Sequence, residues 1–218
     1  MDVKTAIMKG DAESLRQCLA EDSSRADELI EWGDKKKCMT HPLHFVSDML
    51  FNGTLQKGME LPLVDSLIQA GSHVDFNKDG RGETALIGAA SLGAEDVGLK
   101  LLEAGARPEI RGLFGETALH WAAMLGEDRL VARLIPSSDL NLKDAKYNSP
   151  TVGWAIHGWS SAPAGNHGRQ IEVVIQLVSA GARVEPQMLE SESVRSSPAM
   201  LAALGAAPST ASGPTKRP

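Results

Sequence analysis

The chain has 218 residues, of which 42% are apolar but only 4% aromatic, and its formal net charge at pH 7 is −6. The apolar content excludes a disordered chain, and the negative charge argues against nonspecific nucleic-acid binding, which needs many cations to neutralise phosphates. The two cysteines make no disulfide framework, the N-terminus has no signal pattern and no apolar run could cross a bilayer, so we expect a cytoplasmic protein that binds no membrane.

The first forty residues predict three helices and then a polar connection. A short helix, a turn at residues 10–11 and a second helix with one apolar side account for the start of the chain. Ser24 and Asp27 are predicted to cap a further helix that ends near Trp32-Gly33. The three lysines at 35–37 have the character of a solvated loop rather than of a nucleic-acid contact.

The next stretch predicts two helices separated by an insertion. Pro42 stands in the first turn of a new helix, where its missing N–H costs little. The helical pattern breaks after Leu50, and a loop is predicted over about 51–61. The pattern resumes at Leu63 and ends at Gly71, and Asn, Asp and Gly residues then predict a tight turn over 74–81.

The clearest feature of the chain is a nine-residue motif that occurs twice, beginning at Gly82 and again at Gly115. The threonines of the two copies, Thr84 and Thr117, are 33 residues apart. Each copy predicts a helix, a glycine break and a second helix, and Pro136 ends the last of these. A fixed period of this size indicates a repeat architecture.

A further unit begins near residue 150, where either Ser149 or Pro150 takes the place of the threonine. Its first helix gives way to a loop over about 159–169, and its second helix ends at Gly181. A last helix is predicted over about 193–204, and from residue 206 the composition predicts a mobile tail.

Each part of the motif has a local physical task. A threonine hydroxyl at a helix start accepts an orphan backbone N–H, and the paired alanines let the next helix approach closely. One such unit cannot bury its own apolar face, so several units must stack.

The motif Gly-x-Thr-Ala-Leu-His-x-Ala-Ala, followed by an apolar helix and Ala-Gly-Ala, resembles the ankyrin repeat. The resemblance implies an all-α solenoid of about five to six helix-turn-helix units, with β-turn or hairpin fingers and atypical ends. It implies a single domain over 1–205 and a tail over 206–218. The expected units cover 3–37, 40–81, 82–114, 115–147, 148–185 and, in part, 186–205. The pair Ile87-Gly88 departs from the family, because it replaces the usual histidine and its neighbour.

Two groups of residues could carry chemistry, and for each we favour a structural alternative. Cys38, His41 and His44 are spaced like metal ligands, but His44 takes the position of the family's structural helix-start histidine, as does His120. The segment at 80–82, Gly-Arg-Gly, resembles part of a phosphate-binding loop but lacks the Lys-Ser/Thr that completes one. No catalytic spacing is recognisable. We therefore predict no metal, no cofactor and no enzymatic activity.

The resemblance implies that a partner protein binds to a concave face formed by the finger tips and the first helix of each unit. The middle unit is unusually apolar there, and exposed Phe, Tyr and Met residues are favoured at interfaces. The predicted contact residues are Arg81, Glu83, Leu92, Leu113, Phe114, Glu116, Met124, Leu125, Tyr147, His157 and Trp159.

Two alternatives remain open for this surface. Leu113 and Phe114 could instead cover neighbouring fingers or pack under the loop after Trp159, while Trp121 and Trp154 are expected in the stacked core. The loops at about 51–61 and 159–169 leave the same point of their units and are a second candidate surface.

The predicted function is that of a protein–protein interaction scaffold that is monomeric in the absence of its partner. An inhibitory or chaperone-like subunit that masks one enzyme is an alternative within the same fold. The alternative from a different class is a metal-dependent hydrolytic enzyme that uses the histidines and the inserted loops.

Overall fold

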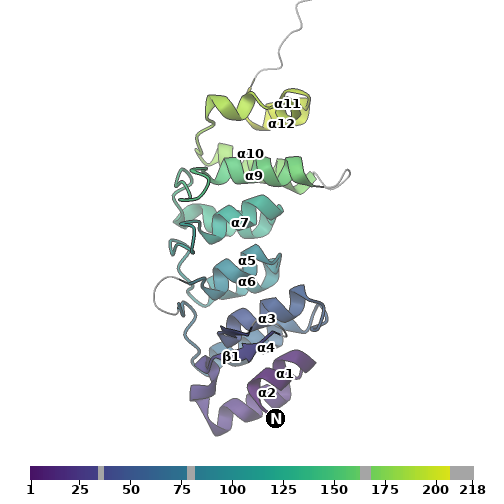
Figure 1. The fold of residues 1–218 in the computed structure, drawn as a ribbon, viewed down its shortest axis with the longest axis vertical. Helices are drawn as coiled ribbons and strands as arrows, with labels where there is room; N and C mark the ends of the chain where they lie inside the picture. The colour runs from purple at the N-terminus through teal and green to yellow at the C-terminus, as the bar shows by residue number, and fades with distance from the viewer. Residues whose placement is uncertain (34–36, 78–81, 163–167, 207–218) are drawn as a thin grey trace, which may run out of the picture.

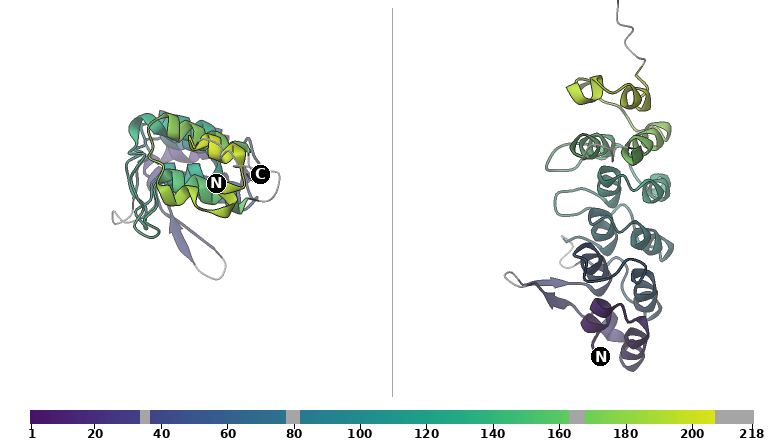
Figure 2. Two further views of the ribbon diagram at one scale, coloured as in Figure 1. Left: turned by 90° about the horizontal axis from the view of Figure 1, so that it is seen from above. Right: turned by 90° about the vertical axis from the view of Figure 1, so that its right-hand side faces the viewer.

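The computed structural model describes residues 1–33, 37–77, 82–162 and 168–206, and its helices stack along one long axis (Figure 1). The helices form two columns, which Figure 2 shows most clearly in its right-hand view. The column of first helices contains α1 (Val3–Lys9), α3 (Pro42–Phe51), α5 (Ala85–Ser91), α7 (Ala118–Leu125), α9 (Thr151–Ser161) and α11 (Glu192–Arg195). The column of second helices contains α2 (Ala12–Glu21), α4 (Glu60–Gln69), α6 (Glu95–Glu103), α8 (Asp128–Leu134), α10 (Gly168–Ser179) and α12 (Pro198–Ala203). The all-α solenoid predicted from the sequence is confirmed.

The threonines of the motif cap their helices as predicted. The hydroxyl of Thr84 accepts the N–H of Ile87 at 3.3 Å. Thr117 and His120 form a capping box, in which the imidazole Nδ1 accepts the N–H of Thr117 at 3.1 Å. The other ring nitrogen of His120 lies 3.0 Å from the carbonyl oxygen of Leu142, in the next finger. His120 is therefore a buried structural residue that ties a helix start to the neighbouring unit.

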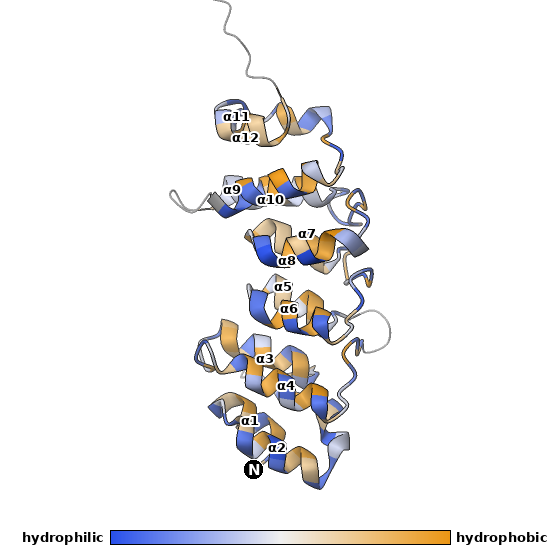
Figure 3. Ribbon diagram, turned by 180° about the vertical axis from the view of Figure 1, so that it is seen from behind, coloured by the Kyte–Doolittle hydropathy of each residue, from blue (hydrophilic) through white to orange (hydrophobic). Residues whose placement is uncertain are grey.

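The core runs without interruption along the stack. Leu86, Leu119 and the paired alanines of both motif copies are buried between successive first helices. On the back of the molecule α4, α6 and α10 alternate hydrophobic and hydrophilic residues around the helix, so that each has one buried side (Figure 3). The closest approach involves Gly158 of α9, where a Cβ would lie 1.8 Å from the carbonyl oxygen of Met124 in α7.

Two positions that departed from the repeat pattern have a steric explanation. A Cβ on Gly88 would lie 2.4 Å from the ring of His44, so the absent side chain makes room for that imidazole. Pro150 is the N-cap residue of α9, so it and not Ser149 takes the position of the threonine. Its neighbour Thr151 donates its hydroxyl to the carbonyl oxygen of Leu140 at 2.8 Å and so ties this helix start to the preceding finger.

The predicted helix ending near Trp32-Gly33 is wrong. A 3-10 turn, η1 (Ser23–Asp27), is followed by an antiparallel hairpin of β1 (Ile30–Trp32) and β2 (Cys38–Thr40), which projects from the stack in Figure 2. Asp22, not Ser24, caps this turn. The carboxylate of Asp27 caps no helix, because it accepts the backbone N–H of His73. The lysines at 35 and 36 lie outside the described residues.

The predicted last helix is also wrong, because it is two short helices, α11 and α12, instead of one. Pro198 has no N–H to continue the first, and the hydroxyl of Ser197 starts the second by accepting the N–H of Met200 at 3.2 Å. Two further 3-10 turns, η3 (Ile135–Ser137) and η4 (Pro186–Leu189), connect the helices, and η3 contains the predicted stop at Pro136. The predicted tail lies, from residue 207 onward, outside the described residues.

Candidate interaction surface

The segments that join one unit to the next, which we call fingers, lie on the side of the first helices (Figure 2). Two neighbouring fingers present large apolar side chains to solvent: Leu113 and Phe114 in one, and Tyr147 in the next, with exposed fractions of 66%, 42% and 64%. The ammonium of Lys146 lies over both rings, 4.7 Å from the centroid of Phe114 and 4.9 Å from that of Tyr147. A cation–π pair of this kind joins the two tips into one surface.

The finger that carries Tyr147 is organised by a buried carboxylate. One oxygen of Asp144 accepts the backbone N–H groups of Lys146 and Tyr147, at 2.8 and 2.6 Å. Its other oxygen accepts the N–H of Ser149 at 3.1 Å and the indole N–H of Trp154 at 3.0 Å. Although burial opposes the charged form, these hydrogen bonds hold the pKa of Asp144 below its usual value. The finger is therefore clamped to α9.

The preceding finger is held in the same way by Glu116, whose carboxylate accepts the N–H of Phe114 at 2.9 Å and the indole N–H of Trp121 at 3.4 Å. Glu116 is fully buried. Its prediction as a contact residue is wrong, because the side chain is buried and both carboxylate oxygens accept hydrogen bonds that hold the finger in place.

Between the fingers and the first helices lies a cavity of about 410 Å³, which we call the aromatic pocket. Trp121 and Trp154 meet edge to face with ring centroids 5.0 Å apart, and Tyr147 stands 6.1 Å from Trp154. Because carboxylates occupy both indole N–H groups, these side chains offer the pocket mainly ring surface. The residues that line it are Trp121, Met124, Tyr147, Ser149, Gly153, Trp154 and His157.

The structure thus brings three of the predicted contact residues, Met124, Tyr147 and His157, around one pocket. The core assignment of Trp154 is correct, whereas Trp121 is only partly buried. No pattern in the sequence indicates Asp144 or Gly153, whose roles depend on the finger folding back onto α9.

The remaining predicted contact residues are scattered. Leu125 is exposed at the end of α7, Leu92 is half-buried after α5, and Glu83 is exposed before it. Trp159 is buried, with 8% of its surface exposed, because it packs into the core from α9. It is therefore not presented to a partner as predicted. Arg81 lies outside the described residues.

The histidines near the start of α3 serve the fold. His41 lies 2.9 Å from the carboxylate of Asp27, and its ring stacks on Phe76. His44 is the third residue of α3, the helix-start position predicted for it, and its ring nitrogen Nε2 lies 3.9 Å from the carboxylate of Asp48. Burial lowers the pKa of His44 to about 4. In the described part of the chain no group of three or more His, Cys, Asp and Glu side chains could hold a metal ion.

Comparison with known proteins points to one family. A family model described as ankyrin repeats (3 copies) matches residues 51–151. An ankyrin repeat-containing protein of Treponema pallidum (strain Nichols) is 40% identical over 94 residues, which are 43% of this chain and 30% of that protein. The chain thus matches less than a third of that relative's length. No helix within the described ranges is long and apolar enough to cross a membrane. The 33-residue period, the capped helix pairs and these matches together show that residues 51–151 consist of ankyrin repeats.

Proposed function

We propose that this protein binds a partner protein through the fingers and first helices of its central units, and that the aromatic pocket receives an apolar side chain of that partner. The observation that carries the proposal is the pocket itself: two indoles, a methionine and a tyrosine enclose about 410 Å³ beside the exposed Phe114. Ankyrin repeats are generally protein–protein interaction modules.

The chemistry of the pocket favours an apolar occupant. Hydrogen bonds to Asp144 and Glu116 hold the two indole rings of the pocket in place. Because the rings are already ordered, little conformational entropy is lost when a partner binds. Complete burial of one Leu, Met or Phe side chain contributes about 1.5–3 kcal/mol. Buried aromatic clusters of this kind are where binding energy concentrates in interfaces.

We also propose that the protein works in the cytoplasm and that its partner is not a nucleic acid. The described cysteines, Cys18 and Cys38, are free thiols, which suits a reducing cytoplasm. The net charge of −6 disfavours nucleic acid as the partner. We treat residues 1–205 as one domain with the unit boundaries predicted above, monomeric until the partner binds and without enzymatic activity.

Affinity capture from the organism that makes the protein tests this function. The double variant Phe114→Ala/Met124→Ala should lose the captured partner while its thermal unfolding stays close to that of the wild type. Phe51→Ala/Ile175→Ala is the matched control, because both side chains are exposed elsewhere, and it should retain capture. Equal capture by both double variants, or a large loss of stability without loss of capture in the first, would contradict the proposal.

A further inference from the structure

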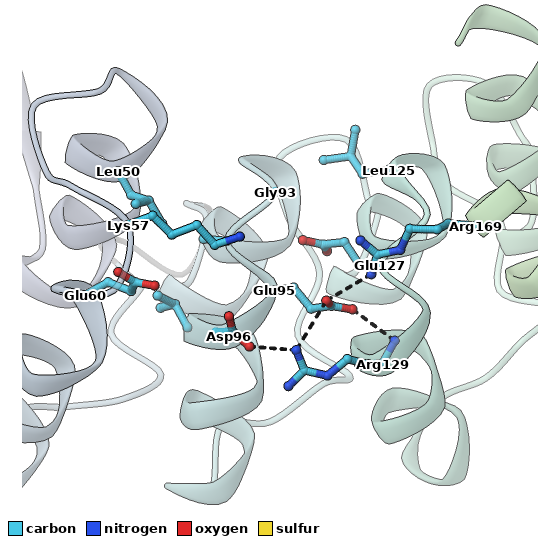
Figure 4. Close-up of a pocket in the computed structure, with 12 residues that line it drawn as sticks. Leu50, Lys57, Glu60, Gly93, Glu95, Asp96, Leu125, Glu127, Arg129 and Arg169 are labelled. Atoms are coloured by element: carbon cyan, nitrogen blue, oxygen red, sulfur yellow. Dashed lines mark hydrogen bonds and ion pairs between the residues drawn. The ribbon is translucent and has the colours of Figure 1, made fainter. Parts of the chain in front are cut away.

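A second cavity, of about 420 Å³, lies at the opposite ends of the first helices from the fingers. We call it the turn cavity. It is bounded by the loop after α3, by the turns that join α5 to α6 and α7 to α8, and by the start of α10 (Figure 4). Successive residues of α7 separate the two sites, since Met124 lines the aromatic pocket and Leu125 the turn cavity.

The two arginines of the turn cavity already have carboxylate partners. Glu95 accepts a hydrogen bond from the Arg169 guanidinium at 3.0 Å and from the backbone N–H of Arg129 at 3.0 Å. The Arg129 guanidinium pairs with Asp96 at 2.8 Å, and Arg169 also pairs with Asp128. Neither arginine is therefore a free cation that would attract an anionic ligand.

Glu127 is the unsatisfied group of this cavity. Only 4% of its surface is exposed, and neither carboxyl oxygen has a hydrogen-bond partner in the described residues. Burial, and then the neighbouring carboxylate of Glu95, raise the pKa of Glu127 to about 8, against a smaller opposing effect of Arg169. In Figure 4 its carboxyl group points into the cavity. A buried carboxyl group without a partner is costly, and a cation supplies both the charge and the donors that it lacks.

One cation already points at Glu127 without reaching it. Figure 4 shows the ammonium of Lys57, from the loop after α3, directed toward the carboxyl group across the cavity. No ion pair joins the two in the part of the chain that the structure describes. The lining also contains the buried carboxylate of Glu60, which accepts the N–H of Gly58. The cavity thus has one more carboxyl group than it has cationic side chains.

We propose that the turn cavity binds a basic side chain, lysine or arginine, of a partner protein, which inserts between Lys57 and the carboxylate of Glu127. An anionic ligand would face Glu127, Glu95 and Glu60, and an apolar one would leave Glu127 without a donor. The site is independent of the aromatic pocket. Lys57 competes with the ligand for the same carboxylate, so removal of its charge strengthens binding.

The test uses the full chain and three short peptides, acetyl-Gly-X-Gly-amide with X as lysine, arginine or norleucine, with spermidine as a further probe. Amide shifts of Glu127 and Arg129 in NMR titrations report binding. Because only the ionised carboxylate binds the cation, affinity for the lysine or arginine peptide should rise about tenfold between about pH 7 and about pH 9. The norleucine peptide should not bind.

Variants separate this site from a surface charge effect. Glu127→Gln should abolish both the binding and its pH dependence, and Lys57→Met should tighten binding of the basic peptides. Glu109→Gln, which removes an exposed carboxylate in a finger, should change neither. Equal binding of the norleucine peptide, unchanged binding by Glu127→Gln, or binding of spermidine without binding of either basic peptide would overturn the proposal. None of these results depends on whether Phe114→Ala/Met124→Ala loses its partner.

Discussion

Replacement of Glu127 by glutamine should change how the stability of this protein depends on pH. The pKa of Glu127 is about 8 in the folded chain, because the side chain is buried beside Glu95. In an unfolded chain a glutamate has a pKa of about 4.3. Between these values the folded state holds a proton that the unfolded state has released. The free energy of unfolding must therefore fall as the pH rises through this window.

The size of the effect follows from the pKa difference. Each pKa unit corresponds to about 1.4 kcal/mol, so a shift of three to four units sets an upper limit of roughly 5 kcal/mol. Water that enters the cavity reduces this cost, and we expect about 2–5 kcal/mol. Glutamine has no proton to lose. The variant should match the wild type near about pH 5 and exceed its stability most at about pH 9.

Urea unfolding of both proteins across this pH range measures the difference directly. Other groups that titrate in the window, such as Asp48 with a pKa of about 7, are present in both chains and cancel. Glu109→Gln is the control, because its exposed carboxylate should not alter the slope. If the wild type and Glu127→Gln curves run parallel from pH 5 to pH 9, then Glu127 is not the buried, protonated group described here.

Two glycines test the close contacts of the first helices by thermal or urea unfolding. Gly158→Ala places a Cβ against the backbone carbonyl of Met124, which cannot move aside, and should cost about 3 kcal/mol or more. Gly88→Ala places its Cβ nearest the side chain of His44 rather than backbone and should cost about 1–3 kcal/mol, with a Gly88→Ala/His44→Ala double variant recovering part of the loss. Gly98→Ala is the control: its nearest contacts are the ends of a flexible leucine, so it should stay within about 1 kcal/mol of the wild type. Equal losses at all three glycines would refute the steric explanation.

The structural features that the sequence predicts correctly are those set by neighbouring residues or by the 33-residue period. The caps at Thr84 and Thr117 follow from hydrogen bonds within one repeat, and the buried alanines recur with the 33-residue period. The hairpin at residues 30–40 was missed because its strands have three residues each, too few to distinguish alternation from a helical period. Trp159 lies at the predicted start of a loop, but α9 continues to Ser161 and the ring packs inward.

The candidate sites were predicted only in part, because they depend on contacts between units. Exposed apolar fingers could be read from Phe114 and Tyr147. The clamps that orient them, Glu116 and Asp144, could not, since an acidic residue in a turn normally faces water. Glu127 was missed for the same reason: it follows a helix-breaking glycine, and only the packing of the neighbouring turns buries it.

The repeat register shows why Glu127 is buried and why a cavity lies beside it. Glu60, Ala94, Glu127 and Gln170 each lie eleven residues before a residue that follows the second helix of their unit, namely Gly71, Gly105, Ser138 and Gly181. All four are buried, so this position faces the stack in every central unit. A long side chain fills it in three units. Ala94 is the exception, and because its side chain is a single methyl group, space remains between Glu60 and Glu127 on either side. The buried carboxyl group of Glu127 therefore carries a desolvation cost that no hydrogen bond within the described residues offsets. That cost is offset when a cation enters the space that Ala94 leaves open.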